Sequence, residues 1–140
     1  MVKIIPFLLI LPLLFSCKST HYTPKNYQAA QLTVGSSGSV TGTFKEFTLL
    51  SNGQFFVNKG VTGELKELQK IGTSETHRIF KKVEDLELGT LKFNHPGNIS
   101  HYLILKKHSK TNTVRWGEPG ISPPAGIDEF YKYLLSVFQQ

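Results

Sequence analysis

The sequence predicts an α+β domain in which a small antiparallel sheet, made of two β-hairpins, carries two helices packed on one face. Two pairs of apolar and aromatic runs, each joined by a short turn segment, are typical of hairpins. Two further segments repeat their apolar residues with the period of a helix. The predicted order of elements along the chain is ββ(β)αββα. Because strands and helices do not alternate one by one, this order is typical of an α+β domain.

The first hairpin is predicted from strands at 44–50 and 54–58. Between them lies Asn52-Gly53, a dipeptide that accepts the positive φ of both central positions in a type I′ turn. A third strand is expected over 64–71, although the sequence ELKELQKI is equally compatible with the start of a helix.

The first helix is predicted over residues 73–86. Thr73 or Ser74 can cap its N-terminus, and Glu75 in the first turn complements the positive end of the helix dipole. Gly89 lies just beyond the expected end. The apolar residues recur with helical spacing and form one face: Ile79, Phe80, Val83 and Leu86.

The second hairpin is predicted from strands at 101–107 and 111–116, which the loop 108–110 connects. Three prolines and three glycines make the following segment, WGEPGISPPAG, irregular. The chain then ends in a helix over 126–138. Its apolar stripe has helical spacing: Ile127, Phe130, Tyr131, Leu134, Leu135 and Phe138.

A signal for export precedes the only cysteine of the chain, Cys17. Lys3 supplies a positive charge, and residues 4–15 form an apolar run interrupted only by two prolines. A basic start, an apolar run and a small residue are typical of a secretory signal peptide. The run is shorter than the ~20 residues that a transmembrane helix needs.

The residues Leu14, Ser16 and Cys17 resemble the lipobox of bacterial lipoproteins, although Phe15 is bulkier than the usual residue at its position. The resemblance covers residues 1–17. It implies that the Cys17 thiol forms a thioether to diacylglycerol and that the chain is cut just before it, which leaves a stable lipid anchor. The alternative is a secreted protein with a free cysteine, since a single cysteine cannot form an internal disulfide.

Three segments are therefore expected: a signal peptide at 1–16, the lipidated Cys17 with a flexible tether over 17–42, and a single α+β domain over 43–140. The segment after the cysteine is rich in Ser, Thr, Gly and Gln and lacks apolar periodicity. At most a short strand over 31–34, followed by a turn, is expected within it.

The residues after Cys17 predict where the protein lies. In the lipoproteins that it resembles, Asp in place of Lys18 retains the chain in the inner membrane, and an acidic cluster in place of KSTH directs some chains to the cell surface. The resemblance therefore favours the periplasmic face of the outer membrane. Without residues 1–16 only Lys3 is lost, so 15 basic and 10 acidic residues give a formal charge of +5. The charges are spread as a solvated surface, and nucleic acid is not an expected partner.

Signatures of catalysis are absent from the sequence, so we expect no enzyme, no cofactor and no metal site. The chain has no GxSxG, HExxH or CxxC motif, no Gly-rich phosphate loop and no EF-hand spacing. His95 and His101 could approach each other, but the nearest acids lack the spacing of metal ligands. Ser100 and His101 would point to opposite faces of a strand, so they cannot form a nucleophile and its base.

The segment between the last strand and the last helix is the candidate partner-binding site. Arg115, Trp116 and Glu118 would form a recognition edge, because Trp and Arg are enriched at binding hot spots and prolines lower the entropy lost on docking. The HPGN sequence at 95–98 would be a second loop at the same end of the sheet. The alternative is that Trp116 belongs to the core, and its burial would contradict the main part of this hypothesis.

The predicted function is that of a non-enzymatic binding or accessory module, held at the membrane by its lipid for a protein partner. The partner would be a subunit of an envelope assembly or an envelope hydrolase that the protein inhibits. The chain resembles small single-domain envelope lipoproteins, and its element order over 74–138 is similar to that of some small protease inhibitors. The alternative is an enzyme or small-ligand carrier acting on envelope material, which needs a concave pocket with convergent polar groups such as His95, His101 and a carboxylate.

Overall fold

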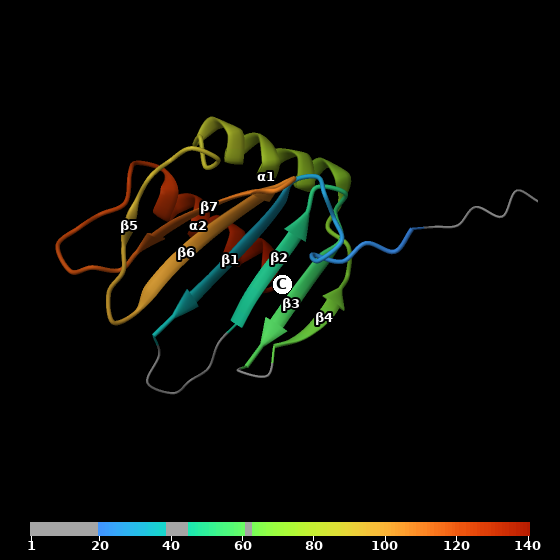
Figure 1. Ribbon diagram of the computed structural model, residues 1–140, viewed down its shortest axis with the longest axis horizontal. Coiled ribbons are helices and arrows are strands. Elements are labelled where there is room, and N and C mark those ends of the chain that lie inside the picture. The colour runs from blue at the N-terminus through green and yellow to red at the C-terminus, as the bar shows by residue number, and fades with distance from the viewer. Residues whose placement is uncertain (1–19, 39–44, 61–62) are drawn as a thin grey trace, which may run out of the picture.

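Among the described residues, seven strands form a single sheet and both helices lie on one of its faces (Figure 1). The computed structural model describes residues 20–38, 45–60 and 63–140, so the predicted signal peptide and Cys17 lie outside the described residues. The elements in chain order are β1 (Gln31–Ser37), β2 (Lys45–Leu50), β3 (Phe55–Lys59), β4 (Glu64–Leu68), α1 (Thr73–Asp85), β5 (Asn94–His95), β6 (Ser100–Lys107), β7 (Lys110–Trp116) and α2 (Ile127–Phe138).

The strand order of the sheet is β4-β3-β2-β1-β6-β7-β5. Neighbouring strands are antiparallel, except that β5 runs parallel to β7. The α+β class is confirmed. The prediction of a small sheet made of two hairpins is wrong, because β1 joins the hairpins and β4 and β5 extend the sheet at its two edges.

The first strand, β1, lies at the centre of the sheet between β2 and β6. Its side chains alternate: Leu32 and Val34 are fully buried among the core residues, and the other face carries Thr33 and Gly35. The polar composition of this outer face is what made the segment resemble a tether. The folded domain therefore begins well before the predicted boundary at residue 43.

The segment ahead of β1 packs against the domain from residue 20 onward, although a flexible tether was predicted there. Tyr27 is buried and forms a second apolar cluster with Leu50 and Phe56 on the outer face of the sheet. Its hydroxyl lies 2.7 Å from Ser51 Oγ. The amide N–H of His108 donates to the Gln28 carbonyl (2.8 Å), which fixes the segment to the β6–β7 hairpin as well.

The β2–β3 hairpin is confirmed, with a different turn from the predicted type I′. Gly53 has a φ of 88°, whereas Asn52 does not adopt positive φ. The N–H of Gly53 donates to the Leu50 carbonyl and the N–H of Leu50 donates to the Gln54 carbonyl, both at 2.9 Å. This pattern is a three-residue loop in which one glycine supplies the left-handed position. The third predicted strand is confirmed as β4.

The two helices match their predicted ranges closely. Gly72 is the N-cap residue of α1 and no side chain caps the helix, so the predicted capping role of Thr73 or Ser74 is wrong. At the start of α2, Gly126 adopts a φ of 86°. Within the described ranges, no helix is long and apolar enough to cross a membrane.

One apolar core fills the space between the sheet and the helices. Phe138, at the end of α2, packs against Phe47 and Phe55 with ring centroids 5.8 and 4.5 Å away. The largest fully buried side chains of this core come from both layers: Leu32, Leu49, Ile79, Leu88, Leu103, Ile127 and Leu134. Burial of both helices on the same face leaves the opposite face of the sheet to the segment ahead of β1 and to solvent.

The β6–β7 hairpin is confirmed, with a shorter loop than predicted. Lys107 pairs with Lys110, so only His108 and Ser109 lie between the strands, and His108 has a φ of 56°. The two-residue strand β5 was predicted to be a loop. Its pairing with the end of β7 places the residues after His95 beside those after Trp116.

Candidate functional site

Two loops lie in contact at one end of the sheet, and together they form what we call the paired-loop end (residues 95–99 and 116–121). Glu118 N–H donates to the His95 carbonyl at 3.0 Å. A Cβ atom on Gly97 would overlap the carbonyl oxygen of Gly117, so the two backbones touch where neither residue has a side chain. The prediction that HPGN and the segment after β7 meet at the same end of the sheet is thus confirmed.

Trp116, the predicted centre of the recognition edge, is a core residue. Its side chain is 5% exposed and belongs to the cluster between the sheet and α2. The indole packs edge-to-face on Tyr131 with ring centroids 5.2 Å apart, and the His101 ring lies 5.8 Å away. This burial contradicts the main part of the recognition-edge hypothesis, because the indole lies in the core and not on the surface.

Arg115 and Glu118 lie apart from each other. Arg115 points to the outer face of the sheet, because neighbouring strand residues face opposite ways, and its guanidinium lies over the Tyr102 ring at 5.6 Å. Glu118 is exposed in the loop, where its Oε2 lies 3.1 Å from His95 Nδ1. The structure therefore does not bring the three predicted residues together, and a role in partner binding stays a prediction for Arg115 and Glu118.

Exposed apolar side chains at the paired-loop end escaped the sequence analysis. Ile99 is 56% exposed and Ile121 is 37% exposed, one in each loop. Of the four large apolar side chains that are exposed in the described residues, these two lie at this end. In the sequence, each of these isoleucines stands among Pro, Gly, Asn and Ser residues and has no apolar neighbour. This isolation was the signal that could have identified them.

The two histidines considered as an active site are held apart by Trp116. His95 and His101 are both strand partners of Trp116, on opposite sides of it. His101 Nδ1 lies 3.1 Å from Tyr131 Oη, while His95 pairs with Glu118. Burial raises the pKa of the Tyr131 phenol, and the nearby Ser36 hydroxyl partly offsets this. Nowhere in the described part of the chain do three His, Cys, Asp or Glu side chains gather as metal ligands.

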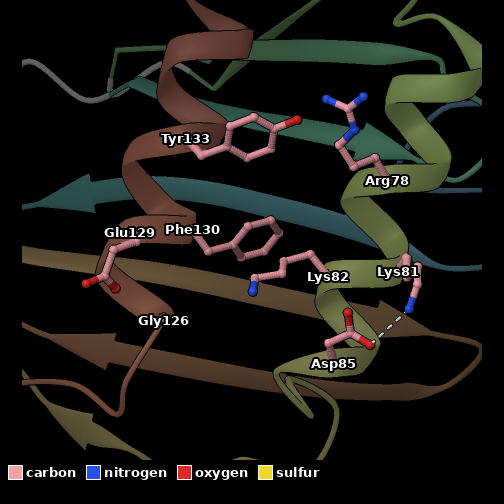
Figure 2. A pocket seen from close by; sticks show the side chains of 8 residues that line it. All are labelled: Arg78, Lys81, Lys82, Asp85, Gly126, Glu129, Phe130 and Tyr133. Carbon is pink, nitrogen blue, oxygen red and sulfur yellow. Dashed lines mark hydrogen bonds and ion pairs between the residues drawn. The ribbon is translucent and has the colours of Figure 1, made fainter.

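A groove between α1 and α2 is a second candidate site (Figure 2). Its volume is about 400 Å³. Phe130 and Tyr133 from α2 form its apolar side, with their rings stacked 6.4 Å apart. The remaining lining residues come from both helices: Arg78, Lys81, Lys82 and Asp85 from α1, and Gly126 and Glu129 beside and on α2.

The chain was compared with protein-family models and with curated proteins. No family model matches the chain, and no curated protein matches it. What the chain binds must therefore be inferred from its own surface.

Proposed function

We propose that this protein is a lipid-anchored lipoprotein of the bacterial cell envelope that binds a protein partner through the paired-loop end. Cys17 would carry the lipid, on the periplasmic face of the outer membrane. The partner would be a subunit of an envelope assembly or an envelope hydrolase that the protein inhibits. The observation that carries the binding role is the display of Ile99 and Ile121 on two loops that are fixed to each other.

The paired loops are suited to binding because they are held in one conformation before any partner arrives. Ser100 Oγ accepts from the Gly97 N–H at 3.0 Å and donates to the Gly97 carbonyl at 3.1 Å, which closes the first loop. The second loop is joined to the first through Glu118. A surface that is already ordered loses little conformational entropy on docking, so exposed apolar side chains there contribute more fully to affinity.

The position of the two ends of the domain also supports this proposal. The segment that begins at residue 20 lies at the end of the sheet where β1 starts, with His21 Nε2 3.1 Å from Glu67 Oε2. The paired-loop end lies where β6 starts, which is the opposite end of the same strands (Figure 1). A lipid on Cys17, three residues before the described segment, would therefore hold one end at the bilayer and direct the paired loops away from it.

The test is crosslinking in native cells with the tagged, full-length protein, followed by affinity capture and mass spectrometry. We expect the wild type to recover one envelope protein in near-stoichiometric amounts, and the double variant Ile99→Glu with Ile121→Glu to lose it. Leu65→Glu is the matched control, because Leu65 is 45% exposed on β4, away from the paired loops. Equal capture by the double variant would overturn the assignment of the paired-loop end.

The lipid anchor is tested separately in the same cells. Cys17→Ser should abolish incorporation of labelled fatty acid and release the protein from the membrane fraction. If the wild type is not labelled, the anchor proposal fails whatever the capture experiment shows. If no protein is captured above the Cys17→Ser background, the alternative of an enzyme or small-ligand carrier gains support.

A further inference from the structure

We propose that the groove between α1 and α2 binds a small amphiphile with a single carboxylate head group and an apolar chain, of the class of the medium-chain fatty acids. This inference is independent of the paired loops and of the lipid anchor. It rests on three properties of the groove: its size, its apolar side and the polar groups that have no partner within it.

The size of the groove fits a small molecule. Its volume of about 400 Å³ lies within the range of roughly 300–1,000 Å³ that is typical of ligand sites. Gly126, just before α2, lines one part of the groove. On α2, the stacked rings of Phe130 and Tyr133 present an apolar surface toward α1 (Figure 2). The aliphatic parts of the Lys82 and Arg78 side chains face these rings and complete an apolar channel.

A buried hydroxyl in the groove has no hydrogen-bond partner. Tyr133 Oη is inaccessible to solvent, and no atom of the described residues accepts or donates a hydrogen bond to it. Buried polar atoms are nearly always paired, so an unpaired hydroxyl indicates a missing partner. In Figure 2 this hydroxyl and the Arg78 guanidinium extend toward one another from the two helices. An acceptor group placed beside this hydroxyl would satisfy it, whereas Arg78 already pairs with Glu75.

The charges of the groove favour a ligand with one negative charge. Arg78 and Lys81 already pair along α1, with Glu75 (3.5 Å) and Asp85 (3.3 Å). Among the described residues Lys82 forms no ion pair, and Figure 2 shows its ammonium group directed across the groove toward Phe130. Glu129 points away from α1 in the same view. One available cation matches a monoanion, which favours a carboxylate over a dianionic phosphate.

The test measures binding of sodium decanoate to the full chain carrying Cys17→Ser, which removes the lipid and keeps every described residue. Titration is followed by backbone amide chemical shifts, and we expect the shifts to localise to α1 and α2. Lys82→Met keeps the length of the side chain and removes its charge, and should weaken binding about tenfold. Tyr133→Phe should weaken it severalfold. Lys132→Met is the matched control, since Lys132 is an exposed lysine of α2 that does not line the groove and pairs with Asp128 instead, and it should leave the affinity unchanged.

Decylamine and decyl phosphate test the head group of the ligand, and a peptide titration and sedimentation test whether a protein occupies the groove instead. Decylamine should not bind, because its head group has the charge of Lys82, and decyl phosphate should bind less tightly than decanoate. Shifts outside the groove, or equal affinity in Lys82→Met, would overturn the proposal. The proposal is also overturned if decanoate causes no shifts in the groove while an acidic amphipathic peptide does, because the occupant would then be a protein segment. It is overturned as well if sedimentation shows a dimer that Lys82→Met abolishes, because the occupant would then be a second copy of the chain.

Discussion

The ring of Tyr102 on β6 lies across Gly35, its antiparallel neighbour on β1. The phenol therefore spans the central strand and donates to Glu46 Oε2 on β2 at 2.7 Å. Gly35 makes this possible, because a Cβ atom there would lie 2.5 Å from Tyr102 Oη. The Arg115 guanidinium on β7 lies over the same ring, so the polar groups of Glu46, Tyr102 and Arg115 cross the outer face of the sheet from β2 to β7.

Gly35→Ala should destabilise the protein by about 1–3 kcal/mol, because the added methyl group must displace a buried ring and its hydrogen bond. Gly89→Ala is the control: its Cβ would make an ordinary contact of 3.6 Å with Leu105, and we expect a change within about 0.5 kcal/mol. Urea unfolding followed by far-UV circular dichroism measures both. A similar midpoint for the two variants would show that the Tyr102 ring moves without cost.

Stability should fall at alkaline pH through Tyr102. Burial raises the pKa of this phenol above its ordinary value of about 10, and the hydrogen bond and the charge of Glu46 raise it further, while Arg115 opposes the shift. The unfolded chain thus loses this proton at lower pH than the folded chain. The contribution is complete below about pH 10 and is lost as the pH rises above that value, at up to about 1.4 kcal/mol per pH unit.

Tyr102→Phe should flatten this alkaline slope of the unfolding free energy between about pH 9 and 11. The Tyr131 phenol, whose pKa burial also raises, keeps part of the slope. The comparison is between urea titrations of the wild type and the variant at each pH. If the unfolding free energies of the wild type and the variant change with pH in parallel, Tyr102 ionises at the same pH in the folded and unfolded chains, and the prediction is wrong.

Asn112→Ala should cost about 1–3 kcal/mol. The Asn112 amide group donates to the carbonyls of Leu88 (2.7 Å) and Leu91 (2.8 Å), and its oxygen accepts from Lys92 Nζ at 2.9 Å. The variant leaves these carbonyls without their donor in the turn after α1. Asn98→Ala, in an exposed loop position, should be close to neutral. Thermal unfolding of the two variants is the measurement, and equal melting temperatures would contradict this role.

Tyr27→Ala should destabilise the protein by about 3 kcal/mol, since it removes the centre of the cluster with Leu50 and Phe56. Tyr22→Ala serves as the control, because Tyr22 is 36% exposed and packs on Tyr27 in an edge-to-face geometry with ring centroids 5.2 Å apart. We expect the control to lose less than about 1 kcal/mol. Rapid proteolysis between residues 20 and 30 in the wild type would argue against the packed segment.

Local patterns predicted the helices and the two hairpins because their signals lie within a few residues of each other. The apolar stripe of α2 predicted a helix over 126–138, and the observed helix is Ile127–Phe138. The β2–β3 hairpin depended on one dipeptide between two apolar runs. Even there, the turn type was missed, because both Asn52 and Gly53 accept positive φ and only the tertiary structure decides which of them adopts it.

The central position of β1 could not be predicted, since it depends on residues far along the chain. Gly35 and Thr33 look like linker residues until Tyr102 and Thr48 are placed beside them; the hydroxyls of Thr33 and Thr48 lie 2.9 Å apart. A strand with one polar face and only two buried apolar side chains has a weak pattern. The two residues of β5 are too few to show any pattern.

The candidate sites were predictable to different degrees. The sequence identified the two loops of the paired-loop end, and the alternation of side chains along a strand is enough by itself to place Arg115 and Trp116 on opposite faces. The burial of Trp116 depends on the packing of Tyr131, which comes from α2. The groove has no signal in the sequence, because it exists only where two helices separated by some forty residues come to lie side by side.

The pairing of β1 with β6 has a consequence for biogenesis. β1 (31–37) pairs with β2 on one side and with β6 (100–107) on the other. The hydrogen bonds between β1 and β6 can therefore form only when most of the chain is present. Such long-range contacts slow folding. In a chain that crosses a membrane from its N-terminus, the centre of the sheet cannot assemble until Lys107 has emerged on the far side. For the exported lipoprotein proposed above, this topology would help to keep the polypeptide competent for translocation.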